Sequence, residues 1–432
     1  MKLKVARELQ MKNIPTIKFK KLFINEEFVD SVLGKTFETV DPRTEEVIIE
    51  IAEATKEDVD IAVKVARQAF DNGLWPRMSG AERVKIMVKW TILIEENIEE
   101  VAALDTIDGG KLYSWCKVVD VPEAANILQY YVCAANKIHG DVAPSLAAGC
   151  TMILKPTEQT PLSALFYAHL AKHAEIPDGV FNVVPGFGAT AGAAISSHMD
   201  IDVSFTSLIE IGRRVMQAVA LRNLKLVSLK LGGKSPIMVF DDADVDKAFD
   251  LALFGILHNK GEVCVAFSRV FVEERKNKAQ FDKILSYIEH GKNERATLLH
   301  GVRKVGTKDT ILSLLDSHHI DVILEGLPSE YAPVVSVVEK PTIFTNVKDD
   351  MLIAQDEIFG LVMTHSKFKN IDEAIKKANN TKYGLAAGIV NHNLEIAFVR
   401  VSFGSIATLP LIMTALLEVK SIATPIYNSP WL

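Results

Sequence analysis

The sequence predicts an α/β fold built around a doubly wound parallel sheet. From Ala147 onward, short apolar runs alternate with amphipathic helical patterns, which is typical of parallel strands joined by crossover helices. The chain has 432 residues, 48% of them hydrophobic, so it can bury the cores of two or three domains. In such a fold, ligands bind at the carboxyl ends of the strands.

The elements before Ala147 are predicted from turn and capping signals. Thr55 and Ser79 each begin a helical pattern and are followed three residues later by an acidic residue, which is the arrangement of a capping box. The expected elements of this part are hairpins at 23–29 and from 37 to 42 onward, and helices from 55, from 79 past 101 and over 124–135.

In the alternating part, from Ala147 onward, short strand-like runs and helical spacing predict the elements. It gives strands at 152–154, 180–184, 202–205 and 225–229, and helices over 161–173, 189–197 and 210–221. Further along the chain, strands are expected at 270–272 and 385–390, helices over 281–290 and 372–379, and a helical pattern over 309–339 that departs from the α/β alternation.

Composition excludes several classes of protein. The net charge is −7 with acids and bases mixed, so the chain has no electrostatic footprint for nucleic acid. No apolar run approaches the roughly 20 residues that span a bilayer. The basic N-terminus lacks the apolar stretch of a secretory signal. An organelle transit peptide is the weaker interpretation, and a cytoplasmic location is expected.

The four cysteines have neither disulfide nor zinc spacing; they are Cys116, Cys133, Cys150 and Cys264. We therefore expect no metal and a reducing compartment.

The stretch from Leu229 to Arg269 is the strongest candidate for a site. A strand-like run leads into a tight Gly232-Gly233 turn, a helical run follows, and Cys264 then stands on a short loop. This order could present a thiol at a cleft. A buried structural cysteine is the alternative, and the local pattern alone favours it.

Two further features could contact a dinucleotide. The turn over 185–192 spaces its glycines one residue more widely than the usual fingerprint, and any tight strand-to-helix turn favours glycine. Lys155 and Glu158 follow the end of a strand, where they could hydrogen-bond a ribose while the carboxylate repels a 2′-phosphate. A solvated loop pair is the alternative for these two residues.

Read together, the motifs resemble the aldehyde dehydrogenase superfamily, most closely its NAD-dependent plant cytosolic branch. The matching stretches occur in the family's order and are LKPTEQTPLSALFYAHLAK, IPDGVFNVVPGFGATAGAAISSH, LGGKSPIMVFDDADVD, NKGEVC, QDEIFG and ANNTKYGLAAGI. The resemblance implies an N-terminal extension (1–22), a cofactor-binding domain with N-terminal helices (23–255), an α/β catalytic domain (256–404) and a partly deleted β oligomerisation arm (405–432). It also implies a homo-oligomer, a dimer or tetramer.

The resemblance implies a chemistry and a set of site residues. Cys264 matches the nucleophile, which attacks an aromatic or short aliphatic aldehyde; hydride then passes to NAD, and water hydrolyses the thioester. Lys155 and Glu158 match the adenosine-ribose contacts and Glu357 the nicotinamide-ribose contact. The remaining cofactor positions are Gly188 at the adenine-side turn, Phe205, Ser207 and Leu231 along the cleft, and Phe359 beside Glu357.

Several departures fall on the chemistry. The family's general-base glutamate is replaced by Lys230, and a lysine with its ordinary pKa near 10.4 does not accept a proton at neutral pH. The segment that carries the family's oxyanion-donating asparagine is absent near Asp141, and such a donor is typically worth about 10²–10³ in rate. Ser207 and Leu208 replace a glycine and a serine that favour cofactor binding.

Other departures concern the length of the chain. Family sequence is missing after Glu274 and after Gly404, and an atypical insert occupies 306–339. Part of that insert resembles the capsid-like region of copia-type retrotransposon polyproteins, and a family-specific helical insertion is the alternative. We therefore expect an aldehyde dehydrogenase with impaired turnover. A catalytically dead homologue acting as a binding or assembly partner, or a truncated gene product, is the alternative.

Overall fold

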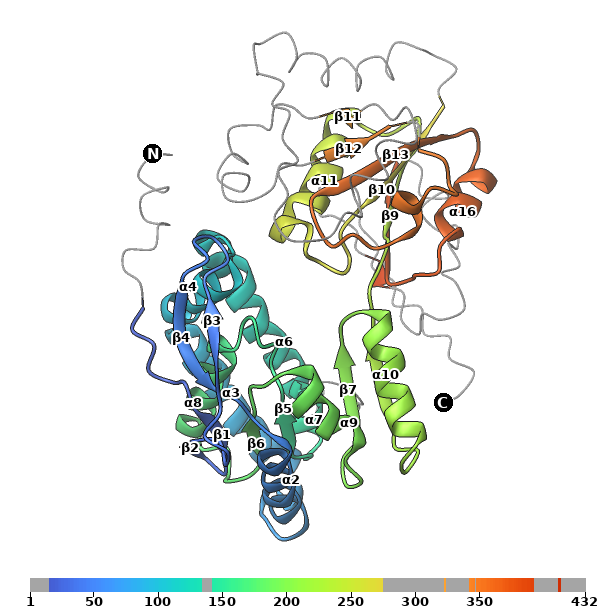
Figure 1. Cartoon of the computed structure of the whole chain (residues 1–432). Helices are drawn as coiled ribbons and strands as arrows, with labels where there is room; N and C mark the ends of the chain where they lie inside the picture. Colours follow the sequence, from blue (N-terminus) through green and yellow to red (C-terminus); the bar gives the residue numbers. More distant parts are fainter. Residues whose placement is uncertain are drawn as a thin grey trace, which may run out of the picture. The chain divides into compact units, whose positions relative to one another are not determined.

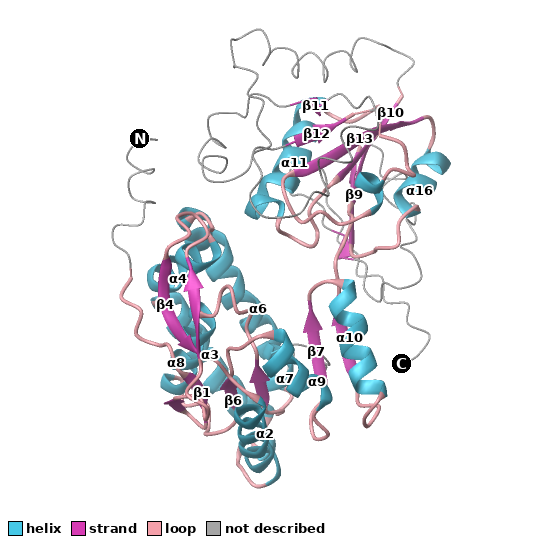
Figure 2. Ribbon diagram, in the orientation of Figure 1, coloured by secondary structure: helices cyan, strands magenta, loops and turns pink. Residues whose placement is uncertain are grey.

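The computed structural model describes residues 15–133, 142–274, 322–323, 342–345, 347–391 and 411–412. The chain divides into two compact units, Met1–Lys230 and Leu231–Leu432, and each is considered by itself (Figures 1 and 2). The functional domain boundaries expected at 255 and 404 stay a prediction.

Unit 1 begins with two antiparallel hairpins, as the turn signals predict. The first joins β1 (Leu22–Ile24) to β2 (Glu27–Val29) through Asn25 and Glu26, whose φ angles are 55° and 65°. Two consecutive left-handed residues match the right-handed twist of the flanking strands. The second hairpin pairs β3 (Thr36–Val40) with β4 (Val47–Ala52).

The predicted capping box at the start of α2 (Lys56–Asp71) is present and extends into the core. The carboxylate of Asp58 accepts from the backbone N–H of Thr55 at 2.8 Å. It also accepts from Ser31 Oγ and from the backbone N–H of Val32, both at 2.9 Å. Asp58 therefore fastens the helix to the loop after β2 as well as capping it.

The helical part of unit 1 follows, and it carries most of the apolar core. The long helix predicted from residue 79 past 101 is interrupted at Asn97, and Gly110, with φ at 64°, ends the second half. The elements are η1 (Trp75–Arg77), α3 (Gly80–Glu96), α4 (Ile98–Gly109), α5 (Tyr113–Trp115), η2 (Cys116–Asp120), α6 (Val121–Cys133) and α7 (Val142–Ala147).

The alternating part of unit 1 confirms the predicted order of strands and helices. β5 pairs in parallel with β6, and β7 with β8. These two pairs lie in separate sheets. β5 and β6 belong to a sheet in the order β2-β1-β6-β5, in which β1 runs antiparallel to β6, whereas β7 and β8 form a two-stranded sheet. The elements are β5 (Met152–Leu154), α8 (Leu162–His173), β6 (Phe181–Val183), η3 (Gly188–Gly192), α9 (Ala193–Ser197), β7 (Val203–Thr206), α10 (Ile209–Ala220) and β8 (Val227–Lys230).

Unit 2 contains a sheet in the order β11-β12-β13-β10-β9-β14-β15, parallel except for β11. The central strands β9 and β10 are buried along their length, as expected of a sheet covered on both faces. The elements are β9 (Pro236–Val239), α11 (Val245–Leu257), η4 (His258–Gly261), β10 (Arg269–Glu273), β11 (Val322–Ile323), β12 (Thr342–Phe344), α15 (Leu352–Gln355), β13 (Val362–Phe368), α16 (Ile371–Asn379), β14 (Ala386–Val390) and β15 (Leu411–Ile412).

Helices cover both faces of this sheet (Figure 1). Ile237 and Val239 of β9 pack with α11, whereas Met238, between them, packs with Ala374 and Ala378 of α16. Alternate residues of one strand thus enter two separate cores. This arrangement confirms the predicted α/β fold with crossover helices on either side.

One local prediction is wrong, and several cannot be compared. Within the helical pattern at 309–339, the two described residues, Val322–Ile323, form a strand, because their backbone pairs with Phe344 and Ile343. The remainder of the 306–339 insert, the helix at 281–290 and the junction at Asp141 lie outside the described residues. Of the predicted arm at 405–432, only Leu411–Ile412 is described, pairing in parallel with β14.

Candidate active site

A glycine pair at the start of unit 2 holds the carboxylate of Glu357. The backbone N–H of Gly233 donates to Glu357 Oε1 at 3.1 Å. A Cβ atom on Gly232 would overlap the same carboxyl group, so glycine is required for this close approach. The backbone N–H of Glu357 donates to Tyr383 Oη at 3.2 Å, which anchors the loop that carries the carboxylate. The predicted ribose ligand therefore sits on the predicted turn.

The loop of Cys264 packs on the second glycine of the same pair. A Cβ atom on Gly233 would overlap the carbonyl oxygen of Cys264. The loop follows η4, in which Asn259 and Lys260 have left-handed φ angles of 46° and 61°. Cys264 is half-buried and forms no disulfide. The structure thus brings Cys264 and Glu357 to one turn.

Phe359 and Leu231 border this cluster. Phe359 has a φ of 57° and leaves 48% of its surface exposed. A large aromatic residue rarely adopts this left-handed conformation, and strain of this kind concentrates at ligand-binding segments. Leu231 is half-buried and directly precedes the glycine pair.

Burial disfavours the thiolate form of Cys116 and of Cys150. Cys116 is fully buried, and desolvation, followed by the charges of Asp105 and Asp120, raises the pKa of its thiol to about 12. Desolvation also raises the pKa of the Cys150 thiol. Since the thiolate is the reactive form, neither residue matches the role expected of Cys264.

Lys234, which sequence patterns did not single out, is buried directly after the glycine pair. It is only 1% exposed, and its Nζ has no hydrogen-bond partner among the described residues. Desolvation and then the nearby charge of Arg269 lower the pKa of Lys234 to about 8, against the opposing charges of Asp356 and Glu357. The only signal for its burial was its position between Gly233 and the apolar strand β9.

Arg269 is the second buried cation of unit 2. Its guanidinium donates to the carbonyl oxygens of Lys234 at 2.8 Å, Lys377 at 3.1 Å and Ala378 at 2.8 Å. It therefore ties the segment after the glycine pair to the end of α16. Desolvation lowers the pKa of Arg269 to about 10, and the guanidinium remains charged at neutral pH.

In unit 1, Lys155 and Glu158 lie at the carboxyl ends of β5 and β6. Lys155 Nζ donates to the carbonyl oxygens of Pro156 at 2.8 Å and Gly186 at 2.7 Å, and lies 3.6 Å from Glu158 Oε2. Desolvation lowers the pKa of Lys155. At Gly188 a Cβ atom would meet no protein atom within 4 Å, so this turn is open.

The remaining predicted residues of unit 1 lie at the ends of β7 and β8. Phe205 is opposite Leu229 and Thr206 is opposite Lys230 in the parallel register. The backbone N–H of Ser207 donates to the carbonyl of Lys230 at 3.2 Å. Ser207 and Lys230 are thus neighbours at the carboxyl edge where this fold class binds its ligands.

Neither a membrane span nor a metal site is found in the part of the chain that the structure describes. No helix there is both long and apolar enough to cross a bilayer. No three or more His, Cys, Asp or Glu side chains gather there in a way that could hold a metal ion.

Comparison with known proteins identifies the family. The family model described as "Aldehyde dehydrogenase family" matches residues 28–145 and 140–402. The chain is 47% identical to aldehyde dehydrogenase family 2 member C4 of Arabidopsis thaliana, over 97% of each protein. The chain belongs to the aldehyde dehydrogenase family. The resemblance inferred from the motifs is confirmed.

Solved aldehyde dehydrogenases share the fold. An NAD-dependent aldehyde dehydrogenase from Sinorhizobium meliloti is 30% identical with a TM-score of 0.78, covering 96% of this chain and 89% of that one. An indole-3-acetaldehyde dehydrogenase solved with NAD+ is 30% identical with a TM-score of 0.73, covering 91% and 87%. These two structures support the α/β assignment made from the sequence.

The alignments also bear on the length of this aldehyde dehydrogenase. The alignment with the Arabidopsis relative extends over 515 positions, more than the 432 residues of the chain, so the relative has segments that this chain lacks. The family model matches in two pieces that meet at residues 140–145. That junction coincides with the predicted deletion near Asp141.

Proposed function

We propose that this chain is an NAD-dependent aldehyde dehydrogenase that forms a covalent adduct with an aromatic or short aliphatic aldehyde but releases the acid slowly. The observation that carries the proposal is the shared turn in unit 2. The loop of Cys264 and the carboxylate of Glu357 both pack on Gly232-Gly233. A nucleophile and a ribose ligand are therefore held on one rigid element, as catalysis by proximity requires.

Each unit, taken by itself, offers residues that fit one part of NAD. Lys155 and Glu158 offer a donor and an acceptor beside the open turn at Gly188. In unit 2, Glu357 would hold the nicotinamide ribose, with Phe359 and Leu231 as further cofactor contacts; in unit 1, Phe205 and Ser207 would contact the cofactor at the strand ends. NAD, when bound, supplies the two-electron acceptor for oxidation of the aldehyde.

The nucleophile of the first half-reaction is retained, although the oxyanion donor expected from the family is absent. The Cys264 thiolate adds to the aldehyde carbon, a C–S bond forms, and the negative charge moves to the carbonyl oxygen. Oxidation of that adduct leaves an acyl group on sulfur. Half-burial of Cys264 suits this role, because the thiol stays accessible while part of the solvent is excluded.

The second half-reaction needs a base that this chain lacks at the expected position. Water must lose a proton as it attacks the thioester, and the C–S bond then breaks to release the acid and the thiol. Lys230 ends β8 where the family has a glutamate. A lysine side chain is not the carboxylate base that the family places there, so we infer that acylation outruns deacylation.

A role in assembly is the second candidate, and Lys230 favours it. A chain that cannot deacylate could still bind NAD and associate with intact subunits of the family. Co-purification of the full chain with an intact family member would support this role. The homo-oligomeric state and the cytoplasmic location stay predictions.

The proposal predicts one acyl group per chain at Cys264. After incubation with NAD and benzaldehyde, intact-mass spectrometry should show a single adduct, and NADH absorbance should rise by at most one equivalent before slowing. Cys264→Ser should abolish both signals, whereas Cys150→Ser, a matched change at an exposed cysteine, should keep them. Steady multiple turnover by the unaltered chain would contradict the proposal.

A glutamate at position 230 alone should not restore rapid turnover. Lys230→Glu supplies a base, but the oxyanion donor that the family carries in its missing segment is still absent, and such a donor is worth about 10²–10³ in rate. The check is the steady-state rate of NADH production by Lys230→Glu. A rate equal to that of an intact relative would show that the missing segment is dispensable.

An alanine at position 232 should weaken NAD binding by about tenfold. Its methyl group would displace the carboxylate of Glu357 and break the hydrogen bond to Gly233, and a bond to a charged group is worth about 1.5–3 kcal/mol. Calorimetric titration with NAD measures the change. Gly109→Ala is the control, because a methyl group there meets only ordinary contacts of 3.6 Å or more. Equal affinity in both variants would exclude Glu357 as a ribose ligand.

A further inference from the structure

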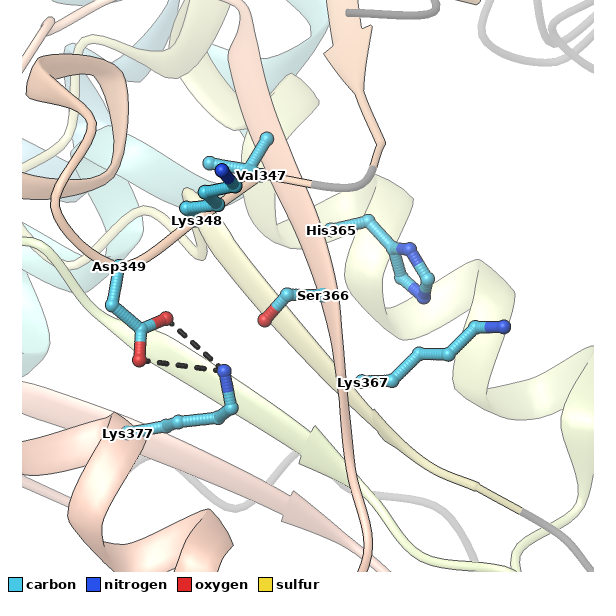
Figure 3. A pocket seen from close by; sticks show the side chains of 7 residues that line it. All are labelled: Val347, Lys348, Asp349, His365, Ser366, Lys367 and Lys377. Atoms are coloured by element: carbon cyan, nitrogen blue, oxygen red, sulfur yellow. Dashed lines mark hydrogen bonds and ion pairs between the residues drawn. The ribbon is translucent and has the colours of Figure 1, made fainter.

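A pocket of about 410 Å³ opens at the edge of β13, apart from the Gly232-Gly233 turn (Figure 3). β12 pairs with β13 only as far as Thr364, so the later residues of β13 border the opening. The volume lies within the range of about 300–1,000 Å³ that is typical of small-molecule sites. The pocket is lined by Val347, Lys348, Asp349, His365, Ser366, Lys367 and Lys377.

The charges around this pocket favour an anion. Three lysines and one aspartate line it; Lys348 and Lys377 lie on the same side of β13 as Asp349 and Ser366, whereas Lys367 and His365 point to the other side (Figure 3). Asp349 is already engaged, because both of its oxygens accept from Lys377 Nζ, at 3.1 and 3.3 Å. Desolvation, with the nearby charge of Lys367, lowers the pKa of His365 to about 4, so its ring is neutral at pH 7.

Two donors on the lining have no partner among the described residues. Ser366 Oγ is buried without a hydrogen bond and points toward the Asp349–Lys377 pair (Figure 3). Lys348 is exposed, and its ammonium forms no hydrogen bond or ion pair with a described residue. A buried hydroxyl that lacks a partner is costly, and a ligand oxygen would satisfy it.

A second positive group lies behind the same residues. A smaller adjoining cavity is lined by Ser366, Asp349 and Lys377 together with Arg269. The guanidinium of Arg269 is fixed by three backbone carbonyls and stays charged. Its positive charge adds to that of the lysines, and because Arg269 is itself buried, solvent screens its field less than it screens theirs.

We propose that this pocket binds the phosphate group of a small phosphate monoester. On the side of Ser366, the charges of Lys348, Lys377 and Arg269 less that of Asp349 leave two positive charges, which match the charge of about −1.5 to −2 that a monoester carries at pH 7. Lysine ammonium groups and the Ser366 hydroxyl are the donors that phosphate oxygens need. The volume exceeds that of a bare phosphate, and Val347 is the single apolar residue of the lining, so the organic part is small and polar. The site is independent of the function proposed above.

Calorimetric titration of the full chain tests this site. The probes are glycerol phosphate, inorganic phosphate and acetate at constant ionic strength. Glycerol phosphate should bind more tightly than inorganic phosphate, and acetate should give no heat. Lys348→Gln and Ser366→Ala should each weaken glycerol phosphate binding by about tenfold. Lys376→Gln, the same charge change on α16 outside the lining, should leave it unchanged.

Three outcomes would overturn the assignment. Equal weakening of glycerol phosphate binding by Lys348→Gln and Lys376→Gln would show that the loss of affinity comes from the change in net charge alone. Tighter binding of inorganic phosphate than of glycerol phosphate would show that the organic part is not recognised. Loss of the signal when NAD saturates the protein would place the phosphate in the dinucleotide site instead.

Discussion

Arg269→Met is expected to lower the free energy of unfolding by about 3–5 kcal/mol, the largest effect predicted for this chain. The guanidinium is 3% exposed and donates to three carbonyl oxygens, those of Lys234, Lys377 and Ala378. Methionine occupies a similar volume but donates no hydrogen bond, so three carbonyl groups would lose a partner where little water reaches them.

Urea denaturation followed by far-ultraviolet circular dichroism measures the loss. Arg43→Met is the control: that arginine is bonded only to nearby Asp41 and is partly exposed, so its removal should cost below about 1 kcal/mol. A cost for Arg269→Met as small as the control's would mean that the three carbonyls find other donors.

Lys234→Met is expected to stabilise the protein by about 3 kcal/mol at pH 7. The pKa of Lys234 falls from 10.5 to about 8 on folding, and each unit is worth about 1.4 kcal/mol. Between those pH values the unfolded chain binds more protons, so the stability of the natural chain rises with pH. The full penalty is present below pH 8 and disappears as the pH approaches 10.5.

The pH dependence separates this effect from ordinary repacking. Urea denaturation at pH 7, 8.5 and 10 should show the natural chain and Lys234→Met converging as the pH rises. Lys382→Met, which removes an exposed lysine paired with Asp356, should change stability by less than about 0.5 kcal/mol at every pH. A constant difference between Lys234→Met and the natural chain would exclude titration of Lys234 as the cause.

The sequence predicts those features whose partners are close along the chain. The capping boxes at Thr55 and Ser79 are present because both members lie within four residues. The alternation of strands and helices after Ala147 likewise follows from the spacing of apolar residues within each short segment. The pairing of β1 with β6 joins Phe23 to Val183, and nothing in the local pattern indicates that register.

The features of the candidate site differ in the same respect: contacts between residues far apart in the sequence could not be predicted from local patterns. The meeting of Glu357 with Gly233 spans 124 residues and was not predicted; the family resemblance indicated only that Glu357 contacts the nicotinamide ribose. Lys234 was missed because a lysine is normally exposed, and Arg269, which bonds its backbone carbonyl, is 35 residues away in the sequence. Long-range packing of a charged side chain leaves no periodic signal in the sequence.

The hydrogen bonds of Lys155 have a consequence for the entropy that is lost on ligand binding. Two of the three N–H groups of its ammonium donate to the carbonyls of Pro156 and Gly186, and Glu158 lies 3.6 Å away as an ion-pair partner, so one N–H group is left for a ligand. A free lysine loses about 1.5–2 kcal/mol of rotamer entropy when it is immobilised. Because Lys155 is already ordered in the folded protein, ligand binding would not lose this entropy again. A ribose arriving at this strand end would therefore find a preorganised donor, which favours affinity without any added contact.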